Sequence, residues 1–344
     1  MKSLCVLRLS ALGDCINAFG LIGALHKKYP EINITWVIDK RFAPLFCNEQ
    51  GHDLIPMIRV DFTDSTLKAM LNLRQELKGH HFDYLFNLQT SLKSSLCSLT
   101  CKAQHKYGYD NERAREGHHL FINHQVPSPQ NPHVMAGFLA FAQESGLNID
   151  SPYWDFNLDP YIIDKAKCWV NHEKVFALSP CSAKANKNWT VQGYIALAQH
   201  AHDQGMQVVL LGGPSSLEKE TCEAIEQACP FGINLCGKTT LRELAAILSI
   251  SKLLLAPDSG SMHLASALNT PVIGLFARHN DQRVGPWNFM DLNVSVYPEL
   301  AAKELKSTNI PWRYRIKQEN AMAHISIERV IAAFDEACER YQLL

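Results

Sequence analysis

Residues 252–277, KLLLAPDSGSMHLASALNTPVIGLFA, contain a complete unit of strand, helix and strand. The run KLLLAP is short and apolar, which is typical of a strand buried on both faces. SMHLASAL has the small and apolar residues of a closely packed helix, and PVIGLFA is a second apolar run. A helix between two such runs predicts a crossover between parallel strands, and therefore an α/β fold.

The same alternation repeats along the chain in two series. The first series contains the expected strands LCVLRL (4–9), INITWVID (32–39) and FDYLFNLQT (82–90), with helical stretches between them. The second series begins near residue 174, after a polar, proline-containing stretch at about 148–170. We therefore predict two doubly wound, Rossmann-like α/β domains that face each other across a cleft. The predicted segments are residues 1–160, residues 161–325 and a C-terminal helix over 326–344, whose packing on the N-terminal domain is left open.

The composition describes an ordinary globular protein. Of its 344 residues, 47% are hydrophobic and 19% are charged, and the net charge of -1 gives no reason to expect a nucleic-acid partner. The 11 cysteines are scattered and form no C-x-x-C pair, so we expect buried free thiols in a reducing cytosol and no zinc knuckle. The strand-like first residues predict no signal peptide, and no run approaches the ~20 apolar residues of a membrane helix.

The segment GINLCGKT (232–239) matches the phosphate-loop pattern G-x-x-x-x-G-K-[ST]. Three of its four spacer residues are apolar and predict a short strand, so no loop is left to wrap a phosphate. We interpret the match as a strand, a glycine turn and a helix N-cap at Thr239 or Thr240. A nucleotide is therefore expected elsewhere, and Lys238 is assigned no chemistry.

The segment DSGSMHLASAL (258–268) is the better candidate for an anion site. Ser259, Gly260 and Ser261 are small residues at a helix start, where backbone N–H groups and the helix dipole attract anions. Asp258 ends the preceding strand, and His263 lies in the first helical turn. The alternative for His263 is a partly buried histidine with satisfied hydrogen bonds.

Two further loops follow expected strands of the same domain. In SPCSAKANKNWT (179–190), Ser182 can hydrogen-bond an anion, and Lys184 and Lys187 bring positive charge. In LLGGPSSLEKE (210–220), the glycines allow close approach of the backbone, and Glu218 can accept hydrogen bonds from ribose hydroxyls. A solvated loop lysine and a surface glutamate are the alternatives. Together, the three loops predict an anionic, sugar-bearing ligand.

The N-terminal domain offers one candidate base and several cations. Asp14 follows the first strand in RLSALGD, where it is either a helix N-cap or a carboxylate placed to accept a proton. Lys93, Arg113 and Arg115 suit an acceptor that carries phosphate or carboxylate groups. Exposed arginines without a partner are the alternative.

These segments, taken together, resemble glycosyltransferase family 9, the lipopolysaccharide heptosyltransferases. RLSALGD, KNWT, LCGKTTLRELAAIL and APDSGSMHLASALNTPVIGLFARHNDQRVGPW match the family's motifs in order, from residue 4 to about 288. The resemblance implies a GT-B fold and inverting transfer of heptose from ADP-L-glycero-D-manno-heptose, without a metal or other cofactor. The C-terminal domain would hold the donor, and the N-terminal domain would hold the acceptor, Kdo of lipid A in the inner core. PWRYRIKQENAM near the C-terminus fits the subgroup that adds the first heptose to Kdo.

The resemblance also implies roles for single residues. Asp14 would be the general base. Glu218 would hold the ribose, and the backbone of Thr239 would lie near the adenine. The departing ADP would be stabilised by Lys187, Ser182 and residues 259–261, while Asp258 and His263 would contact the heptose or a phosphate. We expect a cytoplasmic monomer, peripheral to the inner membrane surface. One departure from the pattern is Ala277-Arg278-His279-Asn280, where many members have Gly-Pro-Thr-Asp, so this loop's contacts stay open.

Three alternatives remain at this point. An enzyme that adds the second or third heptose would share these motifs, and the acceptor's phosphorylation is not fixed by them. A sugar-nucleotide-binding protein without catalysis is a second alternative. An NAD-dependent oxidoreductase is a third, although the chain lacks a G-x-G-x-x-G after a strand.

Overall fold

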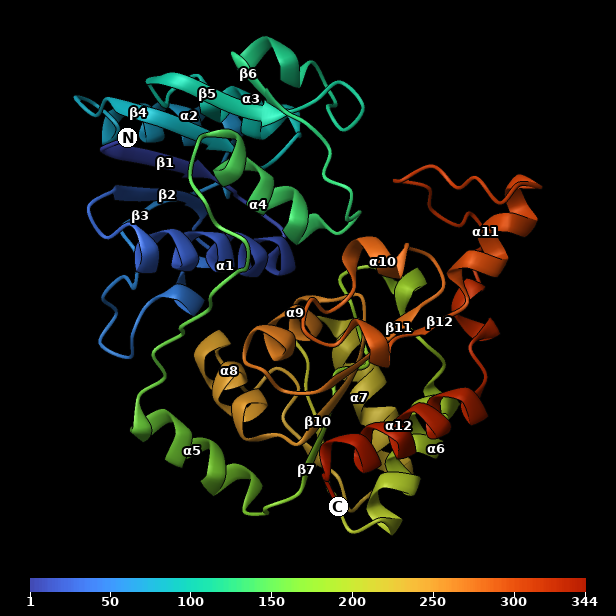
Figure 1. The fold of residues 1–344 in the computed structure, drawn as a ribbon. Helices are drawn as coiled ribbons and strands as arrows, with labels where there is room; N and C mark the ends of the chain where they lie inside the picture. The colour runs from blue at the N-terminus through green and yellow to red at the C-terminus, as the bar shows by residue number, and fades with distance from the viewer. The chain divides into compact units, whose positions relative to one another are not determined.

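The structure, a computed structural model, describes all residues from Met1 to Leu344. The chain divides into two units, Met1–Asn157 and Leu158–Leu344. Each unit contains one six-stranded sheet, and every strand pairing in both sheets is parallel. Helices cover the sheets in the α/β arrangement that the alternating pattern predicts (Figure 1).

The first unit has the strand order β3-β2-β1-β4-β5-β6. Chain order reverses direction between β1 and β4, which makes this edge a topological switch point. The strands are β1 Ser3–Leu7, β2 Asn33–Asp39, β3 Met57–Val60, β4 Phe82–Asn87, β5 Ala103–Tyr109 and β6 His124–Val126. The helices are α1 Leu12–Lys28, α2 Thr66–Glu76, α3 Leu92–Ser98 and α4 Val134–Glu144, with short 3₁₀ turns η1 Ala43–Phe46 and η2 His118–Phe121.

The second unit repeats this topology with the order β12-β11-β10-β7-β8-β9. Its strands are β7 Val175–Leu178, β8 Gln207–Leu210, β9 Ile233–Asn234, β10 Leu253–Pro257, β11 Val272–Phe276 and β12 Val294–Ser295. Its helices are α5 Pro160–Val170, α6 Val191–Asp203, α7 Ser216–Ala228, α8 Leu241–Ile250, α9 Gly260–Ala267, α10 Asp281–Val284, α11 Tyr297–Leu305 and α12 Ile327–Tyr341. The 3₁₀ turns are η3 Ala185–Lys187, η4 Met290–Leu292 and η5 Ala321–His324.

The strand register places the candidate loops at one edge of each sheet. In the second unit, β10 lies between β7 and β11, with Leu255 opposite both Leu178 and Ile273. The loops that follow these three strands therefore leave the sheet at neighbouring points. In the first unit, Gln89 after β4 accepts hydrogen bonds from the backbone of Leu9 and Ser10 after β1, at 2.9 and 3.3 Å.

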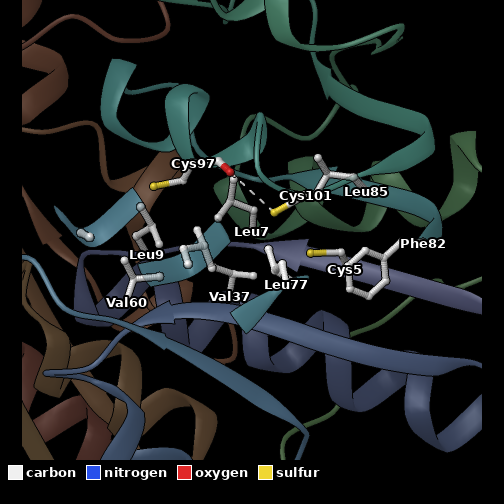
Figure 2. Close-up of a cluster of buried hydrophobic side chains, with 12 residues drawn as sticks. Cys5, Leu7, Leu9, Val37, Val60, Leu77, Phe82, Leu85, Cys97 and Cys101 are labelled. Carbon is white, nitrogen blue, oxygen red and sulfur yellow. Dashed lines mark hydrogen bonds between the residues drawn. The ribbon is translucent and has the colours of Figure 1, made fainter. Parts of the chain in front are cut away.

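The core of the first unit includes a buried cluster under α2 and α3 (Figure 2). Aliphatic side chains from β1, β2 and β3 meet the thiols of Cys5, Cys97 and Cys101 there. The Cys101 thiol donates to the Cys97 carbonyl at 3.7 Å, and burial raises the pKa of Cys97 to about 12. These are packing groups rather than reactive thiols, and all cysteines of the chain are free.

The C-terminal helix packs within the second unit. Phe334 of α12 is fully buried and meets Phe176 of β7 edge to face, with ring centroids 5.1 Å apart. Asp335 accepts a hydrogen bond from His200 of α6 at 2.7 Å. The apolar face of α12 therefore closes one side of the second sheet.

The segment 232–239 forms no phosphate loop, as its spacer residues predict. Residues 233 and 234 are strand β9, and Gly237 turns the chain with a φ of 71°. The Lys238 ammonium donates to the Asn234 carbonyl at 2.8 Å, and Thr240 forms a capping box with Glu243 at the start of α8. In addition, none of the helices has the length and apolar character needed to cross a bilayer.

Candidate functional site

The start of α9 is surrounded by small hydroxyl side chains. Ser259 caps the helix, with its hydroxyl accepting from the Met262 backbone at 3.4 Å. The Ser259 and Ser261 hydroxyls lie 2.8 Å apart, and Ser261 donates to Ser179 at 2.7 Å. Ser179 directly follows β7, so this chain of hydroxyls joins two strand-end loops. The first N–H groups of α9 have no intrahelical partners, which suits them to an anion.

Lys187 and Asp258 meet beside this helix start. The Lys187 ammonium donates to the Asp258 carbonyl at 2.5 Å and lies 3.2 Å from its Oδ2. Both side chains are mostly buried, with 14% and 15% of their surface exposed. The structure thus brings together the lysine of one predicted loop and the aspartate of another.

Two histidines also approach the Asp258 carboxylate. His279 Nδ1 lies 2.6 Å from Oδ2, whereas His263 Nε2 is 3.9 Å from Oδ1, beyond hydrogen-bond range. Burial alone would raise the pKa of Asp258, but the His279 hydrogen bond and the Lys187 charge outweigh it. They hold that pKa well below its usual range, so the carboxylate is ionised at neutral pH.

Ser182 stabilises the loop that carries Lys187. Its hydroxyl donates to the Lys184 carbonyl at 3.0 Å, and its backbone N–H donates to the Asn188 side chain at 2.8 Å. Ser182 is buried, whereas Lys184 is exposed. These two hydrogen bonds inside the loop stabilise it, and the Ser182 hydroxyl proton is taken by the Lys184 carbonyl.

Glu218 clamps the loop between β8 and α7. Its carboxylate accepts from the Gly213 backbone at 2.8 Å and from the Ser215 hydroxyl at 2.5 Å. A Cβ atom on Gly213 would lie only 2.9 Å from Glu218 Oε2, so a side chain there would displace the Glu218 carboxylate from this position. The Gly237 N–H donates to the Gly212 carbonyl at 2.9 Å, which brings the half-buried Thr239 to the same region of the unit.

Asp14 of the first unit pairs with an arginine. It lies in the first turn of α1, whose N-cap is Ala11, so Asp14 is not the capping residue. Its carboxylate forms an ion pair with Arg8, and 36% of its side chain is exposed against 12% for Arg8. The Arg8 guanidinium also donates to the Leu88 carbonyl after β4. Asp14 is thus held at the switch-point edge while part of its carboxylate stays accessible.

The three predicted acceptor cations differ in their surroundings. Lys93 is half-buried, with its ammonium 3.6 Å from the centre of the Phe62 ring. Arg113 is buried, where it pairs with Asp110 and donates to the Val126 carbonyl at 2.5 Å. Arg115 is exposed. Arg113 therefore stabilises its own loop, and Lys93 and Arg115 are the more accessible cations.

Three partners of the site were not predicted from the sequence: Arg8, Ser179 and His279. Arg8 stands inside the RLSALGD motif, and Ser179 is the first polar residue after its strand, so position could have indicated both. His279 lies in the loop that departs from the family pattern. Only the folded loop shows that it reaches back to Asp258.

Comparisons with known proteins agree with this geometry. The family model of glycosyltransferase family 9 (heptosyltransferase) matches residues 70–314. The lipopolysaccharide core heptosyltransferase OpsX of Haemophilus influenzae is 38% identical over 334 residues, covering 96% of this chain and 95% of that protein. Lipopolysaccharide heptosyltransferase 3 of Escherichia coli is 23% identical and covers 94% of this chain and 96% of its own length.

Solved structures share the whole fold. A family 9 glycosyltransferase from Veillonella parvula superposes with a TM-score of 0.78 at 21% identity, covering 98% of this chain and 97% of that one. The E. coli heptosyltransferase WaaC with ADP gives a TM-score of 0.73 at 17% identity, with 97% and 99% coverage. E. coli ADP-heptose heptosyltransferase II gives 0.71 at 20% identity, with 99% and 100% coverage. The two sheets of this chain therefore have the GT-B arrangement of strands and helices.

Proposed function

Because the chain belongs to glycosyltransferase family 9, the heptosyltransferases of lipopolysaccharide core synthesis, we propose a specific reaction for it. The enzyme transfers heptose from ADP-L-glycero-D-manno-heptose to Kdo of the inner core and inverts the anomeric centre. The observation that carries the donor assignment is the pairing of Lys187 with Asp258 beside the start of α9.

The second unit holds the donor in this proposal. The diphosphate lies at the N-terminus of α9. There it accepts hydrogen bonds from the first backbone N–H groups of the helix and from the third proton of the Lys187 ammonium. Asp258 and His263 lie next to the heptose, and Ser182 orders the lysine loop. Glu218 accepts hydrogen bonds from the ribose, beside the Thr239 backbone and the adenine. The similarity to WaaC, whose structure was solved with ADP, supports this placement.

The first unit supplies the base. Asp14 takes the proton of an acceptor hydroxyl while the oxygen of that hydroxyl forms a bond to the anomeric carbon of heptose. The bond from that carbon to the diphosphate breaks on the opposite face, and ADP leaves with the electron pair. The ion pair with Arg8 fixes the position of the Asp14 carboxylate at the end of β1.

The reaction is proposed to need no divalent cation. Charge that develops on the departing diphosphate is met by Lys187 and by the helix N-terminus, which are fixed before the reaction begins. Two positively polarised groups at one place perform the role that a metal ion has in other transferases.

The acceptor is proposed to reach the enzyme from a membrane surface. Lys93 and Arg115 suit its anionic groups. Five of the nine large hydrophobic side chains that stand exposed belong to α2, α3, η2 and their ends: Leu67, Leu71, Leu92, Leu99 and Leu120. Since α3 contacts both α2 and η2, these five leucines stand on neighbouring elements, and we call them together the leucine surface. Its apolar side chains support peripheral association with the inner membrane, and the enzyme is proposed to be a cytoplasmic monomer.

The experiment that tests the reaction uses the purified chain with ADP-heptose and Kdo-lipid A. Mass spectrometry should detect one added heptose for each ADP released, and NMR of the product should show the inverted linkage. The product should also form in the presence of EDTA. Donor hydrolysis without transfer, a retained linkage or complete inhibition by EDTA would each contradict one part of the proposal.

A second candidate reaction is addition of the second or third heptose. It is favoured by the relatives named heptosyltransferase 2 and heptosyltransferase 3, at 22% to 24% identity. The segment PWRYRIKQENAM and the 25% identity to lipopolysaccharide heptosyltransferase 1 of Campylobacter coli favour the first heptose, so this second reaction is the runner-up. The choice of acceptor distinguishes the two reactions.

A further inference from the structure

The loop after β11 places His279 against the carboxylate of Asp258. Nδ1 of His279 is 2.6 Å from Oδ2, and both side chains are mostly buried, with 12% and 15% exposed. A residue far along the chain holds this loop, because the Ile316 N–H donates to the Arg278 carbonyl at 3.1 Å.

The protonation states of the pair follow from their surroundings. Burial lowers the pKa of His279, and the charges of Lys187 and Arg315 add to this effect against the opposing bond to Asp258. The ring is therefore neutral at pH 7, while the Asp258 carboxylate is ionised. A neutral imidazole that faces a carboxylate carries its proton on the facing nitrogen, so Nδ1 donates to Oδ2.

Oδ2 of Asp258 also faces Lys187. The Lys187 ammonium has three protons, and the Asp258 carbonyl and Oδ2 fix its direction through two of them. One proton remains for a ligand. Without the His279 bond, the Asp258 carboxylate could rotate about its Cβ–Cγ bond. Oδ2, the second acceptor of the Lys187 ammonium, would then move with it.

We propose that His279 is a positioning residue of the donor site, which acts through Asp258 to direct the Lys187 ammonium toward the diphosphate. This inference rests on the proposed function, since it takes the diphosphate to bind beside Lys187. His279 itself touches no reacting atom in this scheme. Its contribution is to keep the hydrogen-bonded chain His279–Asp258–Lys187 in one arrangement before the donor arrives.

The experiment measures ADP affinity by calorimetry for His279→Ala, His279→Asn and the wild type. Alanine removes the donor to Oδ2, and ADP should bind roughly tenfold more weakly, as for loss of a charge-assisted hydrogen bond. The asparagine amide N–H can occupy the position of Nδ1 and should restore most of the lost affinity. His200→Ala is the matched control, because it breaks another His–Asp bond of 2.7 Å in the same unit. The control should bind ADP like the wild type.

A double-mutant cycle separates positioning from a general effect on folding. If His279 acts through Lys187, His279→Ala should cause no further loss of ADP affinity in a Lys187→Ala background. Additive losses, or full ADP affinity in His279→Ala, would overturn the inference. Failure of the proposed function looks different: the wild type would not bind ADP, or Lys187→Ala would bind it unchanged.

Kinetics with the full reaction give an independent readout. His279→Ala should raise KM for the ADP-sugar donor and leave KM for the acceptor unchanged. An increase confined to the acceptor KM would contradict the assignment. Thermal unfolding of each variant shows whether the protein remains folded at the assay temperature.

Discussion

In the proposed reaction, Asp14 is the residue on which the chemistry depends most directly. Asp14→Asn keeps the size of the side chain but removes the proton acceptor, so turnover should fall by about 100-fold or more. ADP affinity should not change, because the proposed donor site lies in the second unit. Steady-state kinetics and calorimetry on the same preparation check both statements.

A matched variant controls for loss of an ion pair. Asp53 pairs with Arg59 in the same unit, and Asp53→Asn breaks a comparable Asp–Arg contact away from the switch-point edge. Because such pairs contribute little, turnover should stay within about twofold of the wild type. Near-normal turnover in Asp14→Asn would remove Asp14 as the base.

Asp258 should make stability depend on pH. Its folded pKa is lowered, so it stabilises the fold fully above the unfolded pKa of about 3.9, and this contribution is lost as the pH falls through the folded pKa. The free energy of unfolding should therefore be higher for the wild type than for Asp258→Asn at pH 7. The difference should shrink below about pH 4. Urea unfolding at several pH values measures it, and a constant difference would show that the carboxylate charge is not responsible.

Part of the site could be predicted from single residues and their positions. Lys187, Asp258 and Ser261 follow buried strands, and parallel strands end at one edge, so their meeting follows from the fold class. His279 could not be predicted, because its loop conformation depends on a contact with Ile316, far along the chain. The burial of Arg113 could not be predicted from the sequence either, since it depends on where the Val126 carbonyl lies.

At the scale of elements, α12 should contribute strongly to stability. Phe334→Ala would leave a cavity against Phe176 and should cost about 3–5 kcal/mol. Tyr161→Ala on α5 is the control, because that side chain is 74% exposed and its loss should change stability by less than about 0.5 kcal/mol. Chemical denaturation compares the two variants. Equal effects would mean that α12 does not close the core.

The elements differ in how well the sequence predicts them. Long apolar runs such as β1, β2, β10 and β11 are recognisable because central strands are buried on both faces. The edge strands β3, β6 and β12 have four, three and two residues and were not predicted, since so short a run carries no clear period. β9, also an edge strand, was predicted from the apolar residues of its segment, and this prediction argued against a phosphate loop.

At the scale of the whole molecule, the leucine surface predicts membrane affinity. Leu67→Ser and Leu71→Ser together remove two of its exposed side chains, of 68% and 58% exposure, without opening the core. Each exposed leucine adds apolar area to the bilayer contact, so binding to vesicles of anionic phospholipid should weaken by about tenfold. Co-sedimentation measures this.

The control for the leucine surface is Leu217→Ser. Leu217 is an exposed leucine of α7 in the second unit, with 38% exposure, and its replacement should leave vesicle binding unchanged. Equal binding by the double variant and the wild type would mean that another part of the molecule meets the membrane. Turnover on a water-soluble acceptor should be the same for all three proteins.

The central claim is that this heptosyltransferase adds the first heptose to Kdo. The most direct test compares kcat/KM for heptose transfer from ADP-heptose to two defined acceptors, lipid A with Kdo only and the same lipid already carrying one heptose. The account predicts efficient transfer to the Kdo-only acceptor and little to the heptosylated one. Transfer confined to the heptosylated acceptor would contradict the claim and assign the enzyme to a later step.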